Sequence, residues 1–238
     1  MVENRIAQNF GAWGLLKYAL PTVCMMLFTS IYTMVDGVFV AQFVSVDALS
    51  ALNIVNPLFS LVMGFGVMLG AGGSAVIAKN IGEGEEQQAF DNLSTLVFFG
   101  TILGLVLMVL LLVFMEPILS VLGATEILMP YCKEYCYYIV GFLAPWVLEL
   151  MFSSYFITAG KPQIGLIATL CSGVFNIVGD YVLIVVVGMG IRGAALATGL
   201  ATCIPVVIAL IYFFNKEHSL HFGRIMNRPR MILKSCAN

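Results

Sequence analysis

Residues 93–115 read LSTLVFFGTILGLVLMVLLLVFM and decide the fold class of this 238-residue chain. The stretch carries no charged residue and is mostly aliphatic. A helix of this length extends about 35 Å at 1.5 Å per residue, more than the roughly 30 Å hydrocarbon core of a bilayer. The sequence therefore predicts a membrane-spanning helix here.

The composition of the whole chain supports the same interpretation. Apolar residues make up 61% and charged residues 10%, against about 45–50% and about 25% in soluble domains. So few charges cannot cover a globule of this size in water. We therefore predict an all-α, polytopic protein of the lipid bilayer, and exclude a soluble enzyme, a disordered protein and a nucleic-acid-binding protein.

Five further stretches are long and apolar enough to cross a bilayer. Together with 93–115 they give six expected spans, the others being 14–40, 51–78, 131–158, 163–187 and 191–214. No period-two alternation runs over barrel-like lengths in the sequence, so the spans are expected to be helices. The expected connections are residues 41–50, 79–92 and 116–130 and the glycine turns 160–162 and 188–192.

Lysine and arginine are distributed unevenly over this topology. One side carries Lys133 and Arg192, whereas the side that holds both termini carries nine basic residues, namely Arg5, Lys17, Lys79, Lys161, Lys216, Arg224, Arg228, Arg230 and Lys234. Because positively charged loops remain in the cytoplasm, we expect both termini there. Residues 215–238 are expected to form a basic cytoplasmic tail on anionic headgroups.

Three acidic residues fall inside expected spans: Asp36, Glu149 and Asp180. A carboxylate at the centre of a bilayer costs about 2.5–3.5 kcal/mol on insertion scales, so each is a candidate functional residue. The alternative for each is a position near a span end, where the side chain reaches interfacial water.

Four polar residues are expected at a similar depth in the outer half of the membrane. Asn176 and Asp180 are four residues apart and share a helix face, while Asp36 and Thr198 lie comparably close to the outer ends of their own spans. Carboxylate, amide and hydroxyl oxygens suit a small cation, and two neighbouring carboxylates could instead exchange a proton near neutral pH. Glu149 lies deeper toward the cytoplasm and is a separate candidate for contact with substrate or protons.

The remaining motifs favour packing over chemistry. Gly66, Gly70 and Ser74 recur every four residues, a spacing that permits close helix packing in lipid, and the surrounding GFGVMLGAGGS (64–74) lacks the Lys and Ser/Thr of a phosphate loop. Cys132 and Cys136 have no histidine near them, so neither a metal site nor a disulfide is expected. The sequence offers no nucleophile and base pair, and neither enzymatic activity nor a cofactor is expected.

Five segments give the chain a recognisable pattern. They are ALPTVCMMLFTSIYTMVDGVFVAQFV (19–44), ALSALNIVNPLFSLVMGFGVMLGAGGSAVIAKNIGEGE (48–85), FITAGKPQIGL (156–166), NIVGDYVLI (176–184) and GMGIRGAALATGLA (188–201). With them the chain resembles the N-terminal half of the multidrug and toxic compound extrusion (MATE) transporters, in the bacterial DinF-like and MepA-like branch. The resemblance covers essentially the whole chain.

The resemblance implies a fold of twelve helices in two six-helix lobes around a central cleft. It implies a bacterial plasma (inner) membrane protein that exchanges H⁺ or Na⁺ for amphiphilic, often cationic drugs. The family's cation site in this lobe combines an aspartate of the first helix, Asn and Asp of the fifth and a threonine of the sixth. Asp36, Asn176, Asp180 and Thr198 match these positions.

This chain departs from the family pattern in holding one lobe. We expect residues 1–214 to form the N-terminal lobe and 215–238 to lead to a C-terminal lobe missing from the chain, without which alternating access lacks its second half. Two alternatives to drug export stay open. One is flippase-like export of a lipid-linked precursor, which a strongly basic cleft would support, although no buried arginine is expected in the spans. The other is an inactive truncated remnant.

Overall fold

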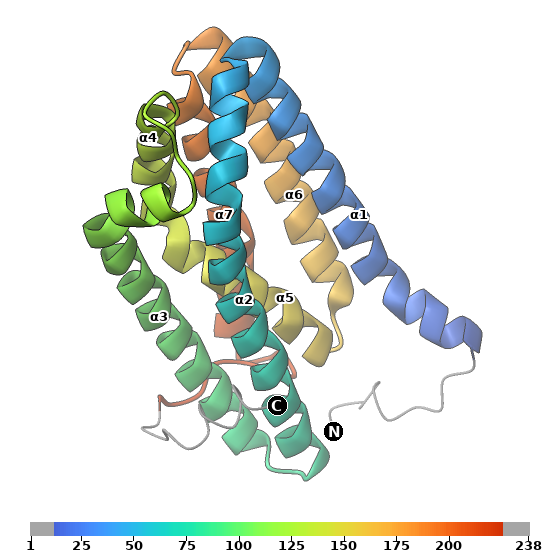
Figure 1. The fold of residues 1–238 in the computed structure, drawn as a ribbon. Helices are drawn as coiled ribbons and strands as arrows, with labels where there is room; N and C mark the ends of the chain where they lie inside the picture. The colour runs from blue at the N-terminus through green and yellow to red at the C-terminus, as the bar shows by residue number, and fades with distance from the viewer. Residues whose placement is uncertain (1–11, 226–238) are drawn as a thin grey trace.

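The computed structural model describes residues 12–225, and every regular element in this range is a helix (Figure 1). The elements are α1 (Ala12–Phe43), α2 (Val46–Gly82), α3 (Glu86–Val121), α4 (Met129–Ile139), the 3₁₀-helix η2 (Val140–Phe142), α5 (Leu143–Thr158), α6 (Pro162–Asp180), the π-helix η3 (Tyr181–Val186) and α7 (Ile191–Phe214). With α4, η2 and α5 counted as one span and α6 with η3 as another, six helices are long and apolar enough to cross a membrane. The six expected spans and the all-α class are confirmed.

Three expected connections are much shorter in the structure. Only residues 44–45, 83–85 and 122–128 separate α1 from α2, α2 from α3 and α3 from α4. The expected bounds of these connections are wrong, because the helices continue into the polar residues on either side, where backbone hydrogen bonds form equally well beyond the apolar layer. Ser45 begins α2 as an N-cap, its hydroxyl accepting from the Ala48 amide at 3.0 Å.

Two prolines interrupt helices and three do not. Pro117 lacks the amide that would bond one turn back, and α3 is kinked nearby at Phe114 (φ −105°, ψ 17°). Pro145 follows η2, where the fourth expected span changes direction between α4 and α5. The helices that contain Pro21, Pro57 and Pro205 continue through them.

Glycines on α2 and α3 bring both helices against α5. A Cβ atom on Gly66 would lie 2.8 Å from the Leu150 side chain, one on Gly70 3.2 Å from the Leu150 carbonyl oxygen, and one on Gly104 2.5 Å from the Ala144 Cα. The packing interpretation of this glycine spacing is confirmed, although Gly73, not Ser74, makes the next close contact, against Tyr155. We call this α2–α3–α5 contact the glycine seam.

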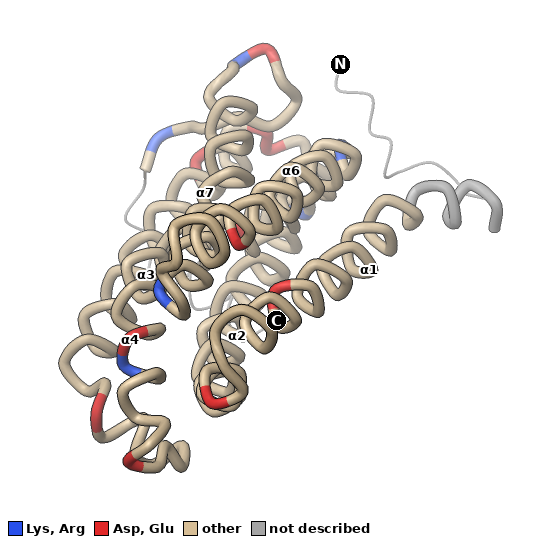
Figure 2. Tube along the Cα trace, turned by 90° about the horizontal axis from the view of Figure 1, so that it is seen from above, with Lys and Arg blue, Asp and Glu red and all other residues tan. Residues whose placement is uncertain are grey.

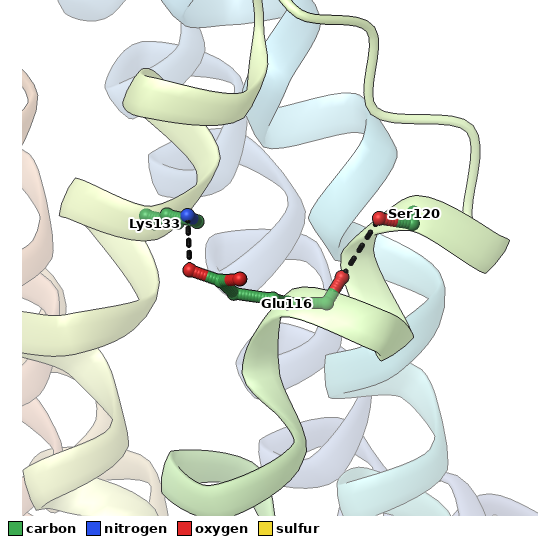
Figure 3. A network of polar contacts seen from close by, with 3 residues as sticks. All are labelled: Glu116, Ser120 and Lys133. Carbon is green, nitrogen blue, oxygen red and sulfur yellow. Dashed lines mark hydrogen bonds and ion pairs between the residues drawn. The ribbon is translucent and has the colours of Figure 1, made fainter.

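Charged residues are few among the described residues, and most of the Cα tube is tan in Figure 2. At one end of the bundle two ion pairs hold α4: Lys133 with Glu116 of α3, whose carbonyl also accepts from Ser120 (Figure 3), and Glu134 with Arg192 of α7. Lys133 and Arg192 are the two basic residues assigned to the outer side. The orientation in the membrane stays a prediction, and Arg5, Arg228, Arg230 and Lys234 lie outside the described residues.

The described part of the expected tail, residues 215–225, packs on the protein. Leu220 is fully buried, and the Phe222 ring packs at steep angles against the rings of Phe213 and Phe214 of α7. Its apolar residues therefore have partners on α3 and α7, and contact of the tail with anionic headgroups stays a prediction. Residues 226–238 of the tail lie outside the described range.

Candidate functional site

The four residues expected to gather do so where α1, α6 and α7 meet. Asn176 donates from Nδ2 to the Thr198 hydroxyl at 3.3 Å, which joins α6 to α7. The carboxyl groups of Asp36 and Asp180 are direct neighbours, which joins α1 to α6. Asn176 and Asp180 are one turn apart on the buried face of α6, 2% and 0% exposed respectively. We call Asp36, Asn176, Asp180 and Thr198 the polar cluster.

The polar cluster lies at one depth in the bundle. Asp36 precedes the end of α1 by seven residues, Asp180 precedes the end of η3 by six, and Thr198 follows the start of α7 by seven. These offsets correspond to about 9–10.5 Å at 1.5 Å per residue, from the same end of the bundle (Figure 1). Asn176 lies one turn further from that end of α6, and its bond to Thr198 places it beside the other residues of the cluster. The depth of the cluster in a membrane stays a prediction.

Oxygen atoms of the polar cluster lack hydrogen-bond partners within the described protein. Asp36 Oδ1, Asn176 Oδ1 and both carboxylate oxygens of Asp180 are buried and unpaired. Burying such groups without partners is costly, and native proteins rarely leave several together. Four unpaired oxygens in one place form a donor set for a cation or for a shared proton.

A cavity of about 770 Å³ opens beside the polar cluster. Its wall includes Asp36, Asn176 and Thr198, while Asp180 lies behind them, fully buried. Apolar and aromatic side chains supply most of the rest, among them Met25, Met26, Phe59, Met63, Trp146 and Phe156. The volume is within the range that holds a drug-sized molecule.

Glu149 of α5 faces the same cavity. It lies on α5, whereas the residues of the polar cluster lie on α1, α6 and α7, and no hydrogen bond or ion pair links it to Asp36 or Asp180 among the described residues. The cavity therefore has two separate acidic groups on its wall, one at the polar cluster and one on α5. Among the described residues its lining has no lysine or arginine.

Two tyrosines of the cavity wall were not identified from the sequence. Tyr32 precedes Asp36 by one turn of α1, and this i, i+4 spacing was a usable signal. Tyr135 of α4 is 6% exposed and adjoins Asp36, Asp180 and Thr198. Nothing in the local sequence separates Tyr135 from the neighbouring tyrosines of α4, since only the fold brings this one to the polar cluster.

A π-helix directly after Asp180 was also not expected. Within η3 the backbone bonds reach one residue further than in an α-helix, as in the 2.8 Å bond from the Val187 amide to the Val182 carbonyl. Such bulges interrupt helices frequently at functional sites. Gly193 of α7 permits the contact there, since a Cβ atom would lie 2.9 Å from the Leu183 carbonyl carbon.

The family profile that matches the chain is MatE, over residues 21–182. The chain belongs to the MatE family. It is 29% identical over 212 residues to the multidrug export protein MepA of Staphylococcus haemolyticus, a match that covers 88% of this chain and 46% of that protein. The chain thus spans about half the length of the curated relatives it matches.

Solved MATE structures contain the same six-helix unit. An outward-facing multidrug resistance MATE transporter matches with a TM-score of 0.82 at 23% identity, covering 93% of this chain and 49% of that one. An inward-facing MATE transporter matches with the same TM-score at 19% identity, covering 92% and 51%. The fold described here is therefore one lobe of a MATE transporter, and it is similar to that lobe in both states.

Proposed function

We propose that this chain forms the cation-coupled N-terminal lobe of an antiporter that exports amphiphilic, often cationic drugs in exchange for H⁺ or Na⁺. The observation that carries the proposal is the polar cluster, whose unpaired buried oxygens adjoin a drug-sized cavity. Membership of the MatE family and the likeness to MepA, a multidrug export protein, support the same role.

In this proposal a cation or proton at Asp36 and Asp180 neutralises a charge that is buried between α1 and α6. The ion changes the conformational equilibrium only by its differential affinity for the two states. The similar TM-scores to an outward-facing and an inward-facing structure support a lobe that moves as a unit. The drug occupies the cavity, with Glu149 contacting substrate or protons at its second acidic wall.

We further propose that the lobe comprises residues 1–214, that the following segment leads to a second lobe, and that both termini face the cytoplasm of a bacterial inner membrane. The basic residues at one end of the bundle, Lys79, Lys161, Lys216 and Arg224, support this orientation.

Labelling of a cysteine introduced at Glu83 or at Gly123, from each side of the membrane in turn, tests the orientation. These two positions lie at opposite ends of the bundle.

The deciding experiment compares Asp36→Asn with Asp47→Asn in proteoliposomes that hold the transporter containing this lobe. Asp47 is an exposed acid in the first turn of α2 and serves as the matched control. We expect Asp36→Asn to lower dye efflux at least 100-fold with insertion intact, and Asp47→Asn to leave efflux near wild type. Normal efflux by Asp36→Asn would refute the assignment.

The coupling ion can be identified by imposing one gradient at a time on the same vesicles and measuring dye efflux. Na⁺ coupling requires efflux that follows a sodium gradient at equal pH, and H⁺ coupling requires efflux that follows a pH gradient without sodium. The two acidic groups on a cavity wall free of lysine and arginine favour cationic drugs over a pyrophosphate-linked lipid. Preferential export of an anionic lipid precursor would refute the proposal that cationic drugs are the substrate.

A further inference from the structure

The segment that follows α7 turns back and crosses the N-terminal end of α3. Three consecutive amides are bonded to helices on either side of it. Phe222 donates to the Phe213 carbonyl at 2.9 Å, Gly223 to the Phe90 carbonyl at 3.2 Å, and Arg224 to Asp91 Oδ1 at 2.7 Å. A chain with its successive amides all donated to the bundle is fixed at that position.

Side chains fix the same segment. Leu220 is fully buried, and the His221 ring lies 3.9 Å from the Phe90 ring, centroid to centroid. Ser94 of α3 donates to the Gly223 carbonyl at 3.1 Å, so both polar backbone groups of Gly223 are bound by α3. Residues 220–224, which we call the strap, therefore have polar and apolar contacts to α3 and α7.

Gly223 and Asp91 make the closest contact between the strap and α3. A Cβ atom on Gly223 would lie 2.4 Å from Asp91 Oδ1 and 2.8 Å from the Asp91 amide and the Phe90 carbonyl carbon. Asp91 is 9% exposed, and its Oδ1 also accepts from Gln87 at 3.0 Å. A carboxylate that accepts from a backbone amide forms a charge-assisted bond, stronger than a neutral one.

We infer that Asp91 and Gly223 lock the strap onto the lobe, so that the first part of the connection after α7 moves with α3 and α7. The strap is then part of the lobe and does not act as a hinge toward a second lobe. The hinge statement rests on the proposed two-lobe function, whereas the lock itself does not depend on it.

Amide hydrogen exchange on the 238-residue chain in nanodiscs tests the lock directly. We expect the amides of residues 222–224 to exchange at least 100-fold more slowly than those of an unstructured peptide. Gly223→Ala should accelerate them at least 10-fold, and Asp91→Ala should accelerate the Arg224 amide most. Asp91→Asn, which keeps an acceptor oxygen, should lie between wild type and Asp91→Ala.

Gly82→Ala is the matched control, because nothing lies within 4 Å of a Cβ atom there and the residue ends α2 close to the start of α3. It should leave exchange of the strap unchanged. Unprotected strap amides in the wild type, or equal exchange in wild type and Gly223→Ala, would overturn the lock.

The hinge statement is tested by dye efflux of Gly223→Ala in the transporter containing this lobe. We expect efflux to fall at least fivefold while insertion stays normal. Wild-type efflux from a variant whose strap is shown to be open would refute the hinge statement. Absence of efflux from the wild type would refute the proposed function and leave the exchange result standing for the lock.

Discussion

The glycine seam and the polar cluster differ in how closely their helices pack and in how their polar groups are paired. At the seam α5 is packed so closely that Gly66, Gly70 and Gly104 have no room for a Cβ atom, and its partners are apolar. At the polar cluster α1 rests mainly on α6, a cavity opens beside it, and buried oxygens remain unpaired. The seam leaves no space between its helices, whereas the cluster keeps buried oxygens without hydrogen-bond partners beside a cavity.

The largest expected change in stability comes from filling the seam. Gly104→Ala places a methyl group 2.5 Å from the Ala144 Cα, where backbone must move. We expect a loss of about 2–3 kcal/mol, as for overpacked cores. The thermal midpoint of the purified chain in detergent measures it. Gly64→Ala, with nothing within 4 Å, is the control and should change the midpoint little.

At the polar cluster a mutation is expected to raise the stability of the chain, whereas Gly104→Ala in the glycine seam is expected to lower it. Asp180→Asn keeps the shape and replaces one of two neighbouring carboxyl groups, fully buried in the bundle, by a neutral amide. We expect the chain to gain about 1–2 kcal/mol in the absence of coupling ion, because replacing buried charges is often stabilising. Asp47→Asn should instead lose a little, since that acid sits favourably at the start of α2. A large loss in Asp180→Asn would mean that the carboxylate is structurally required.

Two hydrogen bonds between α6 and α7 allow the effect of a mutation on stability to be distinguished from its effect on the response to the coupling ion. Ser172 donates to the Ala201 carbonyl at 2.8 Å, and Asn176 donates to Thr198 at 3.3 Å. Ser172→Ala and Thr198→Val should each cost about 1 kcal/mol. Only Thr198→Val should also weaken the stabilisation by the coupling ion, read as the shift of midpoint with ion concentration. Equal ion responses in the two variants would remove Thr198 from the site.

The smallest effect is expected at the exposed end of the bundle, where neither packing nor burial amplifies a charge. Glu116 of the Lys133 ion pair is 72% exposed (Figure 3). Lys133→Gln should therefore cost less than about 1 kcal/mol, and less again in high salt. Midpoints at low and high salt measure this, and a loss as large as that of Gly104→Ala would show that α4 depends on its ion pairs.

The sequence by itself determined the number and class of the helices, because about 20 apolar residues can be satisfied in lipid only as a helix. It also indicated which polar residues are candidates for function, since a carboxylate such as Asp36 is costly in a membrane span. The i, i+4 spacing of Asn176 and Asp180 determined their common face.

Only the tertiary structure decided which side chains meet across helices. Tyr135 reaches the polar cluster, and Gly223 the carboxylate of Asp91, through packing between segments far apart in the chain. Helix ends and the π-helix after Asp180 were likewise decided by the fold. Backbone hydrogen bonds form wherever neighbouring helices allow them, and no local sequence pattern predicts these positions.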